Sequence, residues 1–211
     1  MTTSKIVQHI LEAKMQDLPF SVLKNSVEFR YGPEDFLKYS NYHHRDKGKA
    51  LDSFQDSCNR NTREDIKDDD LNYFPGWSTV VKDLAKLYGN TDTYYLSLMQ
   101  TGETFANRVH ATLHNDQSDV VHINCFGKVD WLLMDPFDEN KTEHRITLEP
   151  GDLLYMRGWT LHETTPLTER GSLIFMNLPY VQIPKDLDKE NQRRDVMKDL
   201  DKDLEEKRFL Y

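Results

Sequence analysis

Between residues 93 and 180 the sequence breaks into short apolar stretches, each followed by a turn. The stretches are 94–100, 109–114, 120–126, 131–134, 145–148, 153–156 and 173–178. Glycine or proline separates most of them, at Gly102, Gly127, Pro136, Pro150, Gly151, Gly158 and Gly171. Apolar stretches this short are typical of strands, and their regular spacing is typical of a β-sandwich or barrel. We therefore predict a mainly β core with flanking helices.

The N-terminal part, residues 1–92, mixes helical and extended patterns. Ile6, Ile10 and Leu11 lie at helical spacing before Pro19, and residues 20–23 are predicted to be extended. Two more helices are predicted at 35–39 and 79–87; Ser78 can cap the second of these. These patterns indicate N-terminal α/β elements.

Residues 43–70 carry many charges and few apolar positions. This composition favours a surface loop or mobile insertion, with a substrate lid as the alternative. At the other end of the chain, residues 185–211 are predicted to be a charged helix with Val196, Leu200 and Leu204 on one side. That stripe could pack on its own domain or form a homodimer contact.

The composition excludes several classes of protein. The 211 residues suit one domain, 1–211, and 27 basic against 36 acidic residues give a net charge of −9. This charge argues against a duplex nucleic-acid partner. No apolar run approaches the roughly 20 residues of a membrane helix, and residues 1–16 do not resemble a signal peptide. With only Cys58 and Cys125, we expect no disulfide scaffold and a cytoplasmic location.

The most informative motif is His114-Asn115-Asp116, a His-x-Asp at the end of a predicted strand. Alternate residues on a strand point the same way, so both side chains could bind one ion. His162, on a segment distant in sequence, is the natural third ligand. Two imidazoles and one carboxylate on one face leave adjacent positions open, as in non-haem Fe(II) oxygenases. A second His-x-Asp, at His44 and Asp46, lies in the charged segment and is expected to be solvated surface.

The region from 94 to 180, about two-fifths of the chain, resembles the jumonji-C and cupin-like hydroxylases. Three features carry the resemblance: His114-x-Asp116 followed by Gly127 and Trp131, a Pro150-Gly151-Asp152 turn leading to Gly158-Trp159 and His162, and Asn177 on the last strand. The resemblance implies a double-stranded β-helix, or jelly-roll, core at 93–180. It also implies Fe(II) as cofactor, and 2-oxoglutarate and O₂ as co-substrates.

The co-substrate pocket departs from the family pattern. The far carboxylate of 2-oxoglutarate needs a cation, which in jumonji-C enzymes is the lysine of Gly-x-Lys-x-Trp. Val129 occupies that position, and Lys128 is one residue early, so it would face outward unless a bulge turns it in. Arg170, in an Arg-x-Ser element similar to that of prolyl hydroxylases, is the other candidate, and a solvent-exposed turn arginine is its alternative.

Four further polar residues are candidates for hydrogen bonds to the co-substrate. They are Thr112, Tyr95, Asn124 and Asn177. For each of them, polar packing in the core or at the surface is an equally good interpretation. Trp131 and Trp159 are expected in the core.

Three functions remain open on the sequence. The first is an Fe(II)- and 2-oxoglutarate-dependent hydroxylase that oxidises a C–H bond, with a protein or peptide side chain favoured over a small-molecule substrate. The second is a metal-binding cupin that binds a small ligand, or acts as a lyase or isomerase, without 2-oxoglutarate; Val129 favours it. The third, a non-catalytic interaction module, is disfavoured by the His/Asp/His set.

Overall fold

The computed structural model describes residues 4–44, 50–60, 63–88, 94–105, 107–108 and 111–177. The helices are α1 Lys5–Met15, α2 Pro33–His44, α3 Phe54–Arg60 and α4 Pro75–Leu87, with 3₁₀ turns η2 Asp68–Tyr73 and η3 Glu103–Phe105. The strands are β1 Phe20–Leu23, β2 Arg63–Asp65, β3 Tyr94–Thr101, β4 Ala111–Asn115, β5 Val120–Phe126, β6 Val129–Met134, β7 His144–Leu148, β8 Leu153–Met156, β9 Leu161–Pro166 and β10 Arg170–Asn177. The predicted C-terminal helix, with its dimer contact, lies outside these residues.

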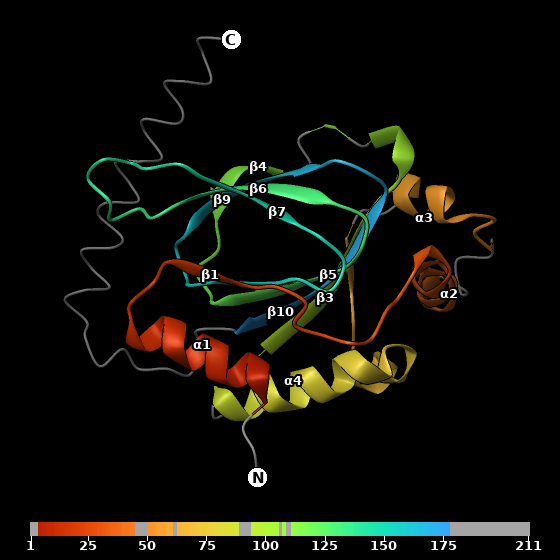
Figure 1. The fold of residues 1–211 in the computed structure, drawn as a ribbon. Helices are drawn as coiled ribbons and strands as arrows, with labels where there is room; N and C mark the ends of the chain where they lie inside the picture. The colour runs from red at the N-terminus through yellow and green to blue at the C-terminus, as the bar shows by residue number, and fades with distance from the viewer. Residues whose placement is uncertain are drawn as a thin grey trace.

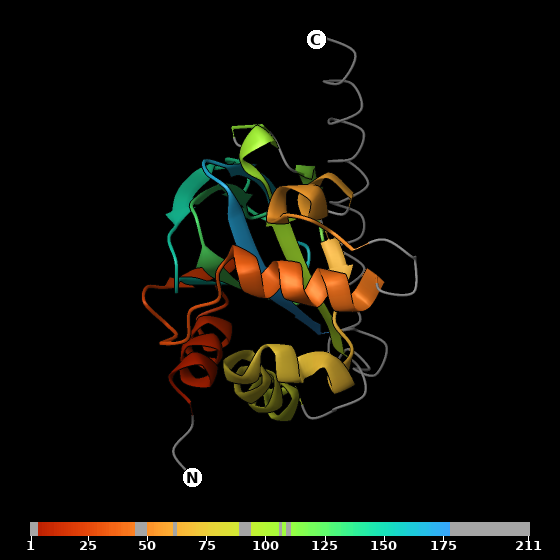
Figure 2. The same ribbon diagram turned by 90° about the vertical axis from the view of Figure 1, so that its right-hand side faces the viewer.

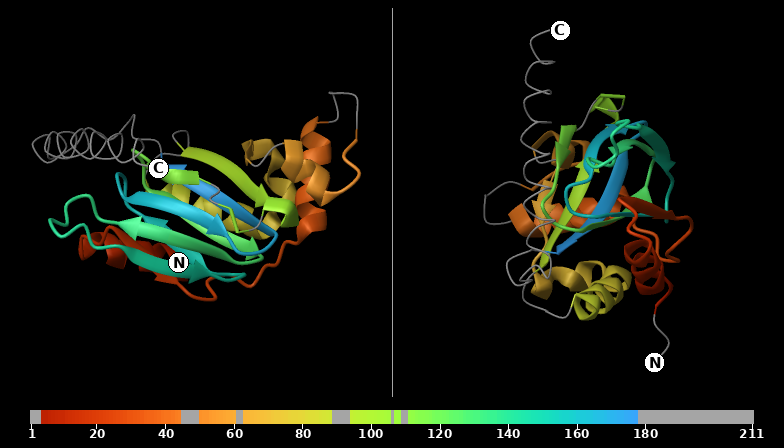
Figure 3. Two further views of the ribbon diagram at one scale, coloured as in Figure 1. Left: turned by 90° about the horizontal axis from the view of Figure 1, so that it is seen from above. Right: turned by 90° about the vertical axis from the view of Figure 1, so that its left-hand side faces the viewer.

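The strands form two antiparallel sheets. One has the order β1-β8-β5-β10-β3-β2, and the other has the order β4-β9-β6-β7. From β3 onward each strand crosses to the other sheet, except that β7 pairs with β6 in the same sheet. The strand orders therefore set β3 over β4, β5 over β6, β8 over β7 and β10 over β9. Figure 3 shows the strands curving around an interior. This is the predicted double-stranded β-helix, or jelly roll.

The two faces of the larger sheet pack against different partners. Alternation along β10 places Ile174 in the core between the sheets and Phe175 in the core under the helices. The helices bury their apolar sides on the outer face of this sheet, with α1 and α4 beneath it and α2 and α3 at its side (Figures 1 and 2). The interior of the roll is thus left to the inward side chains of both sheets.

The prediction of a surface loop at 43–70 is wrong for most of the segment. Phe54 and Cys58 of α3 are buried, and β2 pairs with β3. A few widely spaced apolar residues of this segment are buried in the core. Because most of their sequence neighbours are charged, the composition of the segment did not indicate this burial. Because these residues are part of the fold, a lid made of the whole segment is also excluded.

Three element predictions need smaller corrections. The helix predicted at 79–87 begins at Pro75, which suits the first turn because proline lacks an N–H, so Ser78 is not its cap. The helix predicted at 35–39 is the longer α2. Strand β9 was not predicted, because Leu161-His162-Glu163-Thr164-Thr165-Pro166 is mostly polar.

Candidate metal centre and co-substrate pocket

Two neighbouring, paired strands of the smaller sheet bring the predicted metal ligands together. His114 on β4 is directly opposite His162 on β9, and their ring centroids are 4.2 Å apart. Asp116 follows β4, and its Oδ2 lies 3.5 Å from Nε2 of His162. One ligand atom from each of the three side chains lies within 4.8 Å of the others. Two imidazoles and a carboxylate on one side of an ion form the set found in non-haem iron sites.

Backbone carbonyls fix both imidazoles in the tautomer that a metal requires. Nδ1 of His114 lies 2.7 Å from the carbonyl oxygen of Thr112, and Nδ1 of His162 lies 3.0 Å from that of Thr160. A carbonyl oxygen only accepts, so each Nδ1 carries the proton and donates it. Each Nε2 then keeps its lone pair for the metal, and the ring orientation is set by a neighbour two residues earlier.

The two histidines differ in exposure. His162 is 4% exposed, whereas His114 is exposed at the edge of the smaller sheet. Burial and the nearby His114 hold the pKa of His162 below its usual value, which favours the neutral ring. The site is therefore closed on the β9 side and open on the β4 side.

The second polar feature of the interior is a buried cation. Arg170 begins β10 and is 0% exposed, and burial lowers the pKa of its guanidinium to about 9. Its Nη1 donates to Oγ of Ser172 at 3.2 Å, and Oγ of Ser172 donates to Oδ1 of Asn124 at 3.1 Å. No carboxylate is paired with Arg170 among the described residues. A buried, unpaired charge is costly, so this guanidinium is suited to an anion that arrives from outside.

Other interior groups also lack partners. In the part of the chain that the structure describes, Nε of Arg170, Oγ1 of Thr164 and Nε1 of Trp131 are buried without a hydrogen bond. Trp131 and Thr164 are cross-strand neighbours, and Trp131 contacts His162 with ring centroids 5.7 Å apart. Unsatisfied donors that surround a metal set are a sign of a missing polar ligand.

The metal set and Arg170 lie toward opposite ends of the roll. His162 is near the start of β9, and the chain runs on to Pro166 and then turns into Arg170. Four strand residues span roughly 13 Å. A dicarboxylate bound to the metal at one end and to the long Arg170 side chain at the other suits this separation.

The structure places Lys128 outside the roll. Its Nζ donates to Oε1 of Glu149 at 2.8 Å, and no bulge turns it inward. Val129, in the position of the family lysine, is fully buried in the core between the sheets. Lys128 is therefore paired outside the roll, whereas Arg170 is the buried cation of the interior among the described residues.

Three of the four further candidates lie in surroundings that do not indicate contact with a co-substrate. Asn177 is on the same strand face as Phe175, toward the helices. Thr112 has an exposed position and contributes its carbonyl oxygen to His114. The hydroxyl of Tyr95 donates to Asp65. Asn124, fully buried on the inward face of β5, is the candidate that lies beside Arg170 and Ser172.

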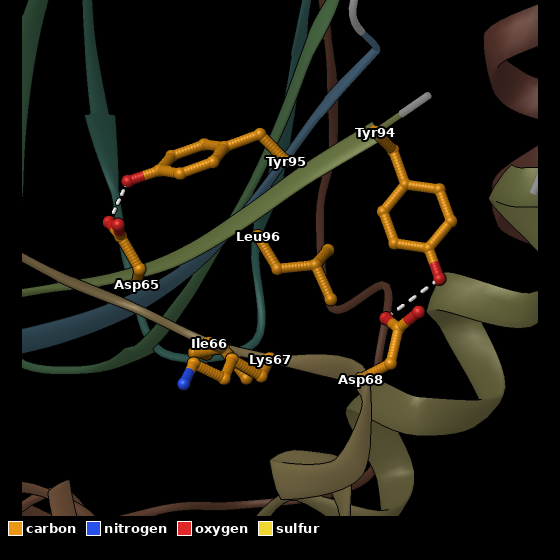
Figure 4. A pocket seen from close by; sticks show the side chains of 7 residues that line it. All are labelled: Asp65, Ile66, Lys67, Asp68, Tyr94, Tyr95 and Leu96. Atoms are coloured by element: carbon orange, nitrogen blue, oxygen red, sulfur yellow. Dashed lines mark hydrogen bonds between the residues drawn. The ribbon is translucent and has the colours of Figure 1, made fainter. Parts of the chain in front are cut away.

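A surface groove lies beside β2 and the start of β3. Its cavity volume is about 510 Å³, and its lining runs from Asp65 to Asp68 and from Tyr94 to Leu96. Figure 4 shows Tyr94 and Tyr95 on opposite sides of β3, each directed at a carboxylate. This groove is separate from the metal ligands.

The expectation that Trp131 lies in the core is confirmed, since it is 3% exposed. Its ring contact with His162 and the position of Thr164 beside it were not predicted. Both positions could have been found from the two-residue alternation of strands. Thr164 shares a strand face with His162, and Trp131 shares one with Val129 and Leu133.

No known protein-family model matches the chain, and no curated protein matches it. Among solved structures it is similar to YcfD, a ribosomal oxygenase from Escherichia coli, with a TM-score of 0.52 and 15% identity. The match covers 80% of this chain and 51% of the oxygenase, so the chain spans about half the length of that protein.

Two weaker matches are a cupin superfamily protein from Desulfitobacterium hafniense and an oxalate decarboxylase from Bacillus subtilis. Their TM-scores are 0.33 and 0.36, both at 14% identity. Each match covers 43% of this chain, with 72% of the cupin chain and 22% of the decarboxylase chain. The match to the oxygenase agrees with the fold described above, the double-stranded β-helix that the motifs predict.

Proposed function

We propose that this protein is an Fe(II)- and 2-oxoglutarate-dependent oxygenase that hydroxylates a C–H bond. The observation that carries the proposal is the buried guanidinium of Arg170, without a carboxylate among the described residues, inside the roll that bears His114, Asp116 and His162. A metal site alone would fit many cupins. A metal site that shares its interior with a cation suited to a distant carboxylate fits a 2-oxo dicarboxylate.

Each residue has a defined task in this proposal. His114, Asp116 and His162 would hold the metal on one face and leave the remaining positions for ligands. Arg170 would bind the far carboxylate, and the hydroxyl of Ser172, held by Asn124, would orient the guanidinium. Nε1 of Trp131 and Oγ1 of Thr164, both without partners in the described chain, are available to the ligand near His162.

When bound, Fe(II) would supply the redox chemistry that couples oxidative decarboxylation of 2-oxoglutarate to C–H oxidation by O₂. The protein residues position the reactants and exclude water from the β9 side of the metal. His114 is exposed at the sheet edge, so the substrate would approach from the β4 side. Its C–H bond would be held near the open metal positions by contacts along that edge.

A protein or peptide side chain is the substrate class that we favour. An open approach at the edge of a sheet suits a side chain that projects from a larger molecule, and the similar fold of a ribosomal oxygenase agrees with this. The net charge of −9 disfavours duplex nucleic acid. No helix in the described part of the chain is long and apolar enough to cross a bilayer. A cytoplasmic location remains part of the proposal.

Turnover without a primary substrate tests the function. Fe(II)-loaded protein is incubated with 2-oxoglutarate and O₂, and succinate is quantified. We expect slow succinate formation that requires O₂ and falls at least tenfold in His162→Ala and Arg170→Met. Lys128→Met is the matched control, because it removes an exposed cation and should retain the wild-type rate.

Val129 supports one alternative, a metal cupin that does not use 2-oxoglutarate. In that case the protein would bind metal through His114 and His162, yet produce no succinate, and Arg170→Met would leave metal and ligand binding unchanged. Equal succinate formation in wild type and Arg170→Met would also reject the assigned role of Arg170.

A further inference from the structure

We infer that Asp119 is a positioning residue for the metal centre: its carboxylate fixes the two turns that carry Asp116 and His162 relative to each other. The inference rests on the proposed metal site but not on 2-oxoglutarate as co-substrate. Asp119 follows Asp116 by three residues, in the turn between β4 and β5. Its task would be to hold ligands and not to bind the ion.

Four donors occupy the carboxylate of Asp119. Oδ1 accepts from the backbone N–H of Gly158 at 2.9 Å. Oδ2 accepts from the hydroxyls of Tyr88 at 3.0 Å and Tyr155 at 3.2 Å, and from Nζ of Lys14. These donors come from α1, the end of α4, β8 and the turn before β9. The carboxylate is thus anchored by four donors from four parts of the fold.

The turn that Asp119 binds leads directly to His162. The N–H of Trp159, next to Gly158, donates to the carbonyl oxygen of Asp116 at 2.6 Å. One residue further, the carbonyl oxygen of Thr160 accepts from Nδ1 of His162. The turn held by the Asp119 carboxylate is therefore connected to two candidate metal ligands. It binds the backbone of Asp116 and the imidazole ring of His162.

Close packing makes this path stiff. A Cβ at Gly158 would lie 2.9 Å from the carbonyl oxygen of Gln117, so the two turns meet backbone to backbone. Trp159 has a φ of 75°, a left-handed conformation that needs support from its surroundings. The Oγ1 of Thr160 also donates to the carbonyl oxygen of Pro19 at 2.7 Å. Without Asp119, the Gly158 N–H and three anchoring side chains lose their shared acceptor.

Asp152 provides a matched control. Its carboxylate is also largely buried and also accepts from a lysine and from backbone: Nζ of Lys24 at 2.7 Å, the N–H of Asn25 at 3.0 Å and the N–H of Glu149 at 2.9 Å. It lies before β8, at the opposite end of that strand from the Gly158 turn. Replacement of Asp152 should therefore destabilise the fold without changing the metal geometry.

The experiment measures binding of Mn(II) alone by calorimetry, and the absorption spectrum of the Co(II)-loaded protein as a report on ligand geometry. We expect Asp119→Ala to weaken Mn(II) binding by about tenfold to a hundredfold and to change the Co(II) spectrum. Asp152→Ala should lower the melting temperature to a similar degree, with Mn(II) affinity within about twofold of wild type. Asp119→Asn, which keeps an oxygen for Gly158, should fold and show an intermediate loss.

Several outcomes would overturn the inference. One is that Asp119→Asn keeps the wild-type Mn(II) affinity and Co(II) spectrum, and that Asp119→Ala folds and binds Mn(II) as tightly as wild type. Asp119 would then be a purely structural anchor. If Asp152→Ala lost as much Mn(II) affinity as Asp119→Ala, the effect would come from general destabilisation of the fold and not from positioning of the ligands. Wild-type protein that binds no Mn(II) would overturn this inference and the metal site together, whereas Mn(II) binding without succinate formation would reject only the oxygenase.

Discussion

Replacement of Arg170 by methionine should have opposite effects on the empty and the ligand-bound protein. Burial lowers the pKa of this guanidinium to about 9, and this shift corresponds to about 5 kcal/mol of unfavourable free energy for the charged form. Methionine is unbranched and apolar, so it removes that cost while it fills much of the space. The substitution also removes the hydrogen bond from Arg170 to Ser172. Replacing a buried ion pair by apolar side chains of similar volume is often neutral or stabilises a protein by about 1–4 kcal/mol. We expect Arg170→Met to change the stability of the empty protein in the same direction.

The ligand reverses this order. At a concentration one hundred times its Kd, 2-oxoglutarate should stabilise the Mn(II)-loaded wild-type protein by about 2.7 kcal/mol. For a domain of this size, that corresponds to a rise in melting temperature of roughly 5–10 °C. Arg170→Met should show almost no rise, because the far carboxylate has lost its cation.

Differential scanning calorimetry without O₂ measures both effects, with Lys128→Met as the control that should behave as wild type in both states. The reasoning is refuted by a full 2-oxoglutarate shift in Arg170→Met. If Arg170→Met lowered the free energy of unfolding of the empty protein by several kcal/mol, the first prediction would be refuted, because Arg170 would then stabilise the fold without a ligand.

Two further predictions concern the framework of the site. Gly127 has a φ of 71°, and a Cβ there would overlap the carbonyl oxygen of Glu169; Gly127→Ala should thus destabilise the protein by about 2 kcal/mol or more in urea titrations, and displace Arg170 enough to weaken 2-oxoglutarate binding. Unchanged stability would contradict the close approach. Burial, with the nearby Asp119, raises the pKa of the Tyr155 hydroxyl well above its ordinary value of 10. The hydroxyl of Tyr155 therefore loses its proton at a lower pH in the unfolded chain than in the folded protein. The contribution of this group to the free energy of unfolding is complete below pH 10 and is lost as the pH rises above that value. Tyr155→Phe should therefore lose less stability than wild type between pH 9 and 11, and an identical pH profile would count against this.

Strands could be predicted where the inward positions are apolar. Val129, Trp131 and Leu133 alternate with outward residues on β6, and the structure confirms that pattern. The same rule failed for β9, because its inward positions are His162 and Thr164. Polar residues at these inward positions removed the apolar alternation by which the strand could have been predicted.

The convergence of the three candidate metal ligands could be predicted because the motif places two of them on one strand face. The competition between Lys128 and Arg170 could not be decided from spacing, since it depends on whether the β5–β6 turn contains a bulge. The structure shows Lys128 outside and Arg170 inside. The acceptor role of Asp119 was also beyond the sequence, because its donors come from four elements that only the fold brings together.

The central claim is that the metal triad and Arg170 together bind 2-oxoglutarate. Its most direct test is anaerobic: Fe(II)-loaded protein is titrated with 2-oxoglutarate, and the visible charge-transfer band of a 2-oxo acid chelated to ferrous iron is recorded. We predict that the band appears, is lost in His114→Ala and His162→Ala, and needs far higher concentrations in Arg170→Met. Stoichiometric Fe(II) binding without the band would contradict the account, and would identify the protein as a metal cupin of another class.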